Sequence, residues 1–194
     1  MARSSDPGPS DGYLTGQLLI AMPTMRDARF ARSVIYMCAH NAEGAMGLVI
    51  NRLAGQVTFP DLLRQLDIEP QGEYREIRVH FGGPVEAGRG FVLHSGDYQH
   101  QSTLQVADEM GLTATMDILH DIAQGRGPRL SLLALGYAGW GPGQLDHEIQ
   151  ANGWLHVAPD EQLVFDDDLD GKWDRAIAKL GFDISLLSGD AGHA

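Results

Sequence analysis

Residues 33–51 have the sequence SVIYMCAHNAEGAMGLVIN, and this stretch decides the fold. It contains two apolar, β-branched runs, residues 33–40 and 46–51, separated by the turn-forming segment 41–45. Two such runs with a short linker predict a β-hairpin. Apolar residues occupy nearly every position of both runs, whereas a strand with one solvent-exposed face alternates strictly between apolar and polar residues. We therefore expect the hairpin to lie in the middle of a sheet that is packed on both faces.

The chain has the length and composition of one globular domain. Its 194 residues are 43% hydrophobic and 21% charged, which is enough to bury a single core without disulfides. The longest apolar run, residues 130–137, is too short to span a bilayer. Residues 1–12 are rich in Ser, Pro, Gly and Asp and lack the apolar core of a signal peptide, so we expect a disordered leader. The single cysteine, Cys38, agrees with a reducing, cytoplasmic location.

The charge balance bears on possible partners. Asp and Glu number 26 against 14 Lys and Arg, which gives a formal net charge of −12. The basic residues are scattered along the sequence, and a nucleic-acid-binding protein normally carries a basic stripe. We therefore expect a protein or small-molecule partner, no direct binding to nucleic acid and no contact with a membrane.

Periodicity and turn residues predict the remaining elements. Pro60 and Asp61 suit the first turn of a helix that begins near residue 58. Strands 77–81 and 90–94 flank a glycine break at 82–84, which predicts a tight turn between strands that are adjacent in the sheet. Further helices are expected at residues 115–124, 144–152 and 169–180, and further strands at 16–21, 103–107, 110–113, 130–137, 154–157 and 162–165.

Several motifs together resemble the YqgE/AlgH family of bacterial proteins. They are LLIAMP (18–23), HNAEGAMGLVIN (40–51), FGGPVEAGRGFVLH (81–94), LGYAGWGPGQLDHEI (135–149), NGWL (152–155) and the terminal AGHA. The resemblance covers residues 13–194 and implies a single α+β domain, built on a large, mixed, partly rolled β-sheet flanked by short helices. No catalytic residues are agreed for the family, so none can be carried over, and some members carry the label of transcriptional regulator. We expect no cofactor.

Cys38 and His40 are the strongest candidates for catalytic residues. They stand two apart in a predicted strand, so their side chains are expected on the same face. An imidazole beside a thiol can favour the thiolate, which attacks electrophiles and peroxide. The alternative is that Cys38 is a small buried apolar residue and His40 a strand-end residue with a structural role.

Glycine-rich segments are the candidates for ligand binding. Residues 136–143 lead from a strand into a helix, and free backbone N–H groups at such a junction can hold an anion. Gly139, Trp140 and Gly141 would take part, and Gly82 with Gly83 would form a second such loop. The segment lacks the spacing of a phosphate-binding loop, so the alternative is that these glycines only let the chain turn.

Two groups of residues have some features of metal sites. Residues 166–171 match the start of a calcium-binding loop, but Ile177 stands where a glutamate ligand belongs, so we expect a capped helix start instead. Three histidines and one aspartate show no ligand spacing: His80, His94, His100 and Asp97. We predict no metal site.

The functional hypothesis follows from these observations. We expect a cytosolic, non-enzymatic binding or regulatory domain, because no catalytic constellation stands out. The alternative is a thiol-based enzyme or redox sensor that uses Cys38 with His40.

Overall fold

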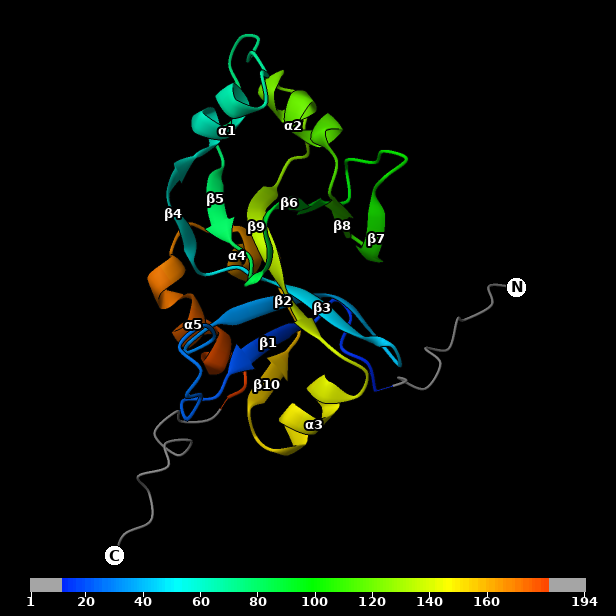
Figure 1. Cartoon of the computed structure of the whole chain (residues 1–194), viewed down its shortest axis with the longest axis vertical. Helices are drawn as coiled ribbons and strands as arrows, with labels where there is room; N and C mark the ends of the chain where they lie inside the picture. The colour runs from blue at the N-terminus through cyan, green and yellow to red at the C-terminus, as the bar shows by residue number, and fades with distance from the viewer. Residues whose placement is uncertain (1–11, 182–194) are drawn as a thin grey trace, which may run out of the picture.

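The computed structural model describes residues 12–181, and the predicted leader at residues 1–12 lies outside them except for Gly12 (Figure 1). The described residues form ten strands and five short helices, joined by turns and loops. The strands are β1 (Leu18–Ala21), β2 (Val34–Asn41), β3 (Gly44–Val49), β4 (Leu53–Thr58), β5 (Arg78–Phe81), β6 (Val85–Ser95), β7 (Leu104–Ala107), β8 (Met110–Thr113), β9 (Ser131–Trp140) and β10 (Trp154–Val157). The helices are α1 (Phe59–Gln65), α2 (Met116–Ala123), α3 (Gln144–Gln150), α4 (Glu161–Phe165) and α5 (Leu169–Ala178). No helix of residues 12–181 has the length and apolar character needed to cross a bilayer.

The strands form one mixed sheet that curls on itself. Its order is β10-β1-β2-β3-β9-β6-β8-β7, and β5 pairs with β9 and with β4. All pairs are antiparallel except β5 with β9. Residues from β1, β2, β3, β6, β8 and β9 share one buried cluster, which α4 and α5 also join. The expected α+β fold around a mixed, partly rolled sheet is therefore confirmed.

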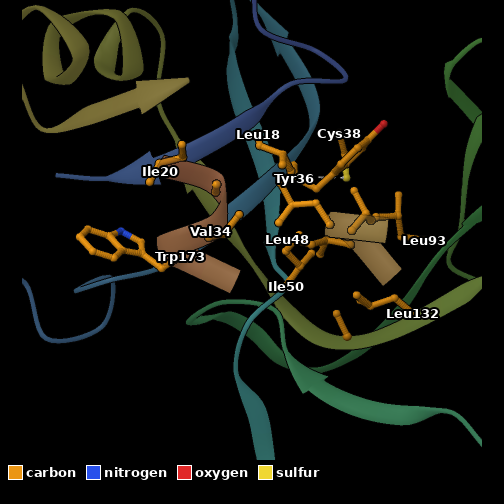
Figure 2. Close-up of a cluster of buried hydrophobic side chains, with 14 of the residues drawn as sticks. Leu18, Ile20, Val34, Tyr36, Cys38, Leu48, Ile50, Leu93, Leu132 and Trp173 are labelled. Carbon is orange, nitrogen blue, oxygen red and sulfur yellow. Dashed lines mark hydrogen bonds between the residues drawn. The ribbon is translucent and has the colours of Figure 1, made fainter. Parts of the chain in front are cut away.

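The hairpin β2–β3 lies in the interior of the sheet, between β1 and β9. Tyr36 and Leu48 pack into the cluster inside the curl (Figure 2), whereas Ile35 and Val49 pack into a second cluster on the outer face, against α3. Packing on both faces explains why nearly every position of the two strands is apolar. The turn is shorter than expected, because β2 continues to residue 41 and β3 begins at residue 44.

The chain crosses the backbone of β9 between β5 and β6. These two strands pair with Leu133 from opposite edges of β9, so the expected adjacency of residues 77–81 and 90–94 is wrong. The crossing is made by Gly82 and Gly83, both buried. A Cβ on Gly83 would lie 2.1 Å from the carbonyl carbon of Tyr137, and one on Gly82 would lie 2.2 Å from the oxygen of Gly136. Only glycine allows two backbones to approach so closely.

The predicted strand at residues 162–165 is also wrong, since this segment lies in α4. Its N-cap is Asp160, whose side chain accepts a hydrogen bond from the Leu163 amide at 2.8 Å. Leu163 and Val164 then pack into the cluster inside the curl. A third apolar cluster lies beneath α1 and α2, which Figure 1 places at the end of the molecule opposite α3.

Candidate functional site

Cys38 lies inside the curl of the sheet and is not open to solvent. Its side chain belongs to the same buried cluster as Tyr36 and Leu48 (Figure 2), and the residue is 2% exposed. The Sγ atom lies 3.8 Å from the carbonyl oxygen of Tyr36. Burial raises the pKa of the Cys38 thiol to about 12, because the thiolate would lose its hydration. The site therefore disfavours the thiolate that nucleophilic chemistry requires.

His40 leaves the other face of β2, so the expected pairing with Cys38 does not form. A β-bulge between Met37 and Ala39 shifts the register and reverses the alternation of side chains. The Nδ1 atom of His40 accepts a hydrogen bond from the Leu14 amide at 3.0 Å, which leaves the hydrogen on Nε2. That Nε2 lies 3.6 Å from a carboxylate oxygen of Asp146 in α3. His40 thus ties the chain before β1 to the outer face of the sheet.

The reactivity of Cys38 gives a direct test of its burial. A rise in pKa from 9.0 to about 12 lowers the thiolate population at neutral pH roughly 1000-fold. We expect iodoacetamide to alkylate the native protein at least about 100-fold more slowly than the urea-unfolded chain at the same pH. Mass spectrometry of samples quenched over time measures both rates. A native rate equal to that of a free thiol would contradict this prediction.

The glycine-rich segment 136–143 forms mostly strand and not a loop. β9 continues through Gly139 to Trp140, and α3 begins at Gln144. The amide of Gly141 already donates to the side-chain Oε1 of Gln144 at 3.0 Å. Gly143 is the N-cap, with a φ of +72°. The predicted anion-binding junction is therefore reduced to residues 141–143, and the Gly141 amide is occupied.

Two of the predicted ligand-binding residues, Gly139 and Trp140, line an open cleft of about 600 Å³, which we call the hairpin cleft. Its lining comes from the tip of the β2–β3 hairpin, from β6 and from the end of β9, which lies between them. The full lining is Ala39, Asn41, Glu43, Gly44, Ala45, Met46, Val85, Glu86, Arg89, Phe91, Tyr137, Gly139 and Trp140. Gly82 and Gly83 lie in the crossing, and Gly141 and Cys38 are likewise outside this lining.

A bulge in β6 places charged side chains at the hairpin cleft. Val85 pairs with Tyr137 and Gly90 pairs with Leu135, so residues 86–89 bulge out of the ladder. Within this bulge a guanidinium nitrogen of Arg89 lies 3.6 Å from a carboxylate oxygen of Glu86. Sequence reasoning missed both residues, although they stand in the motif FGGPVEAGRGFVLH, whose charged pair three residues apart was the available signal.

Aromatic rings form the inner part of the cleft. The guanidinium carbon of Arg89 lies 5.0 Å from the centroid of the Phe91 ring, a cation–π geometry. Phe91 in turn contacts Tyr137 edge to face, with ring centroids 5.8 Å apart. Glu43 lies on the opposite side at the hairpin tip, exposed, and its backbone amide donates to the side chain of Asn41 at 2.8 Å. The hairpin cleft thus combines aromatic surface with two carboxylates and one guanidinium.

The predicted metal candidates lie apart. His80 contacts the carbonyl oxygen of Leu133, and burial lowers the pKa of its imidazole to about 4. His94 lies between the oxygens of Ser95 and Thr113, both at 2.8 Å. His100 is exposed beside Asp117, and Asp97 accepts hydrogen bonds from Ser95 and from the Arg129 amide. Across residues 12–181, no group of three His, Cys, Asp or Glu side chains is placed to hold a metal ion.

The acidic segment before α5 is a helix cap, as expected. Asp168 is the N-cap and accepts a hydrogen bond from the Gly171 amide at 3.1 Å. Asp166 has a role that sequence reasoning missed, because it forms ion pairs with Arg175 and with the fully buried Lys172. Both basic residues come from α5, so this carboxylate fixes the helix against the chain that precedes it.

The basic residues are less scattered than the sequence indicates. Arg26, Arg29 and Arg32 stand on one exposed loop, and Arg52 donates hydrogen bonds to carbonyl oxygens of that loop. Acidic side chains nearby offset part of this charge: Arg29 pairs with Asp27 at 2.8 Å, and Arg32 lies 3.4 Å from Asp174. The loop also covers an aromatic ring, since Arg32 lies 4.2 Å from the centroid of a Trp173 ring.

Comparisons with known proteins place the chain in a family. The model of a family described as AlgH-like matches residues 18–185. UPF0301 protein blr1492 of Bradyrhizobium diazoefficiens is 56% identical over 202 residues, which covers 99% of this chain and 94% of that protein. A UPF0301 protein of Rhodospirillum rubrum is 56% identical over 184 residues, covering 95% of this chain and 96% of that protein.

Solved structures agree with this placement. The solution structure of the AlgH protein from Pseudomonas aeruginosa matches with a TM-score of 0.77 and 43% identity, over 100% of both chains. A crystal structure of protein DIP2367 from Corynebacterium diphtheriae shares the fold at 20% identity, with a TM-score of 0.71 over 97% of this chain and 94% of that one. The motifs, the curled sheet and these matches agree, and the chain belongs to the AlgH-like family.

Proposed function

We propose that this protein is a non-enzymatic, cytosolic binding or regulatory domain that holds a protein or small-molecule partner in the hairpin cleft. The observation that carries the proposal is the convergence of three separate segments on one concave surface. The hairpin tip at Glu43, the β6 bulge at Glu86 and Arg89, and the end of β9 at Trp140 all line it. A concave site with aromatic surface and a few polar groups is typical of ligand-binding clefts.

The state of the reactive groups also supports a binding role. Cys38 is buried, with a raised thiol pKa, and His40 bonds to Leu14 on the opposite face of β2. The alternative, a thiol-based enzyme or redox sensor, requires Cys38 to reach solvent and to ionise. The alkylation measurement described above therefore separates the two proposals.

The regulatory role that we propose acts through contacts with a partner and not through DNA. The formal net charge of −12 repels a phosphate backbone. The loop that carries Arg26, Arg29 and Arg32 also holds Asp27 and lies against Asp174, which reduces its positive charge. A partner with positive or apolar surface fits this electrostatic field better than nucleic acid does.

Two exposed apolar residues provide a matched test. Val85 lines the hairpin cleft and is 36% exposed, whereas Leu104 in β7 is 53% exposed and lies outside its lining. With a photo-crosslinking amino acid in place of Ala42, which is exposed in the turn at the hairpin tip beside Glu43, we expect covalent adducts in cells that naturally make the protein. Val85→Arg should reduce the adduct yield at least about tenfold, because a large charged side chain fills the cleft, whereas Leu104→Arg should leave it unchanged.

Gels and intact-mass spectrometry measure the yield and separate protein adducts from small-molecule adducts. A crosslinker at Asp108, exposed in the β7–β8 turn, is the control for random encounters. The proposal fails if position 108 gives the same adducts as position 42. It also fails if Val85→Arg leaves the adducts intact.

A further inference from the structure

The hairpin cleft has the chemistry of a site for a planar cation. The faces of aromatic rings attract cations, and here Phe91 and Tyr137 lie in contact in the inner part of the cleft. Two glutamates line the cleft together with these rings, Glu86 in the β6 bulge and Glu43 at the hairpin tip. This arrangement of rings and carboxylates can stabilise one positive charge from several directions.

The free protein already places a guanidinium in this site. The Arg89 guanidinium lies 5.0 Å from the centroid of the Phe91 ring and 3.6 Å from the carboxylate of Glu86. Both charged side chains are about half exposed, so solvent screens their attraction and displacement of Arg89 costs little. Arg89 therefore shows which chemical group fits the ring and the carboxylate, and a group from outside can take its place.

One carboxylate of the cleft has no ion-pair partner among residues 12–181. Glu43 makes no ion pair with any residue between 12 and 181, whereas Glu86 is paired with Arg89. The charged lining therefore carries two negative charges and one positive charge, within a chain whose formal net charge is −12. A field of this sign draws cationic partners to the cleft and repels anionic ones.

We propose that the hairpin cleft takes an arginine side chain of a partner protein, with its guanidinium on the Phe91 and Tyr137 rings and between the carboxylates of Glu43 and Glu86. This inference rests on the proposed binding function. Arginine fits better than lysine, because its planar guanidinium stacks on rings and pairs with carboxylates in a fixed geometry. A volume of about 600 Å³ exceeds one side chain, and the apolar lining at Met46 and Val85 accommodates the neighbouring residues of a polypeptide.

Pools of blocked pentapeptides test this inference with the full-length protein. The four flanking positions are randomised over small apolar residues, and the central residue is Arg, Lys, Gln or Glu. Titrations followed by ¹⁵N–¹H correlation spectra report binding at the amides of Gly44, Ala45 and Gly139. We expect the arginine pool to shift these amides and to bind at least about fivefold more tightly than the lysine pool and tenfold more tightly than the glutamine pool.

Charge-neutral variants connect the binding to the proposed residues. Glu43→Gln and Glu86→Gln should each weaken binding of the arginine pool at least about threefold, and the double variant at least about tenfold. Glu109→Gln, an exposed glutamate in the β7–β8 turn, is the matched control and should have no effect. Arg89→Gln should tighten binding, because it removes the group that occupies the ring in the free protein.

The outcomes separate this inference from the proposed function. Equal binding of the arginine and glutamine pools at the cleft would overturn the inference while leaving a binding role intact. Tighter binding of the glutamate pool, lost in Arg89→Gln, would overturn it in favour of an anionic ligand. N-acetyl-arginine amide binding as tightly as the pool would indicate a small cation and not a protein. If no pool shifts the cleft amides, the arginine inference is wrong, and the crosslinking comparison of Val85→Arg with Leu104→Arg still decides the binding role.

Discussion

Gly83→Ala should lower the free energy of unfolding by about 3–5 kcal/mol, the sum expected for forcing atoms into a packed site and for an unfavourable backbone conformation. The new Cβ would lie 2.1 Å from the carbonyl carbon of Tyr137, and the obstacle is backbone that cannot rotate away. The φ of Gly83 is +154°, which residues with a Cβ rarely adopt. Because domains are stable by only about 5–15 kcal/mol, this change removes a large share of the total.

Gly88→Ala is the control, since Gly88 lies in β6 only five residues further on. A Cβ there meets no atom within 4 Å, and its φ lies outside the left-handed region. We expect the stability to change by less than about 1 kcal/mol. Urea unfolding followed by far-ultraviolet circular dichroism measures both variants. If Gly83→Ala is as stable as Gly88→Ala, the backbone at Gly83 does not pass as close to the backbone of β9 at Tyr137 as this contact requires.

Local signals in the sequence predicted those parts of the fold that depend on neighbours along the chain. The helix expected near residue 58 begins with Thr58 as N-cap, and the side chain of Asp61 accepts from the Thr58 amide at 3.1 Å. The hairpin at residues 33–51 is similar, because continuous apolar runs and a short turn favour one pairing. In both cases the deciding residues stand within a few positions of one another.

The crossing over β9 could not be predicted in this way. Gly82 and Gly83 are compatible with an ordinary tight turn, and nothing in residues 77–94 indicates that a strand some 45 residues later lies between β5 and β6. The α4 segment has the same difficulty, because an apolar run of three residues, 163–165, fits a strand or a buried helix equally well. The N-cap at Asp160 was the signal that favoured the helix.

The candidate site was predicted only in part, for a related reason. Gly139 and Trp140 stood out as unusual residues, and both line the hairpin cleft. Glu43 and Arg89 did not, since single charged residues are normal on a surface and only the folded sheet brings these two together. The bulge that separates Cys38 from His40 could not be predicted either, because residues 34–39 are all apolar and give no sign of a reversed alternation.

Asp166→Ala should destabilise the protein by about 3–5 kcal/mol, the usual cost of leaving a buried charge without its partner. The Lys172 ammonium is fully buried and donates to the carbonyl oxygen of Val164 at 2.9 Å, and the Asp166 carboxylate lies 3.6 Å away. Arg175 donates to the same carboxylate at 2.9 Å. Desolvation raises the pKa of Asp166, but the hydrogen bond from Arg175 and the two positive charges outweigh it, so the net shift is downward.

The loss of stability should depend on pH. Burial lowers the pKa of Lys172 from its ordinary 10.5, and Asp166 counteracts that effect, so the pKa falls further in Asp166→Ala. At pH values between the lowered pKa of Lys172 in the folded variant and its ordinary pKa in the unfolded chain, the unfolded chain binds more protons than the folded chain. The free energy of unfolding of the variant therefore rises with pH in this range. We expect Asp166→Ala to lose less stability, relative to the original protein, at pH 9.5 than at pH 7. At the higher pH the Lys172 ammonium of the folded variant can release its proton, so no unpaired charge stays buried.

Two further variants identify the cause. Asp167→Ala removes the neighbouring exposed carboxylate and should change the stability by less than about 0.5 kcal/mol. Adding Lys172→Met to Asp166→Ala should recover most of the loss, since the apolar side chain keeps the volume and removes the buried charge. Urea unfolding at both pH values measures all of them. Equal stabilities of Asp166→Ala and Asp167→Ala would mean that the buried lysine does not need this carboxylate, and its hydrogen bond to the Val164 carbonyl oxygen would then suffice to hold α5 in place.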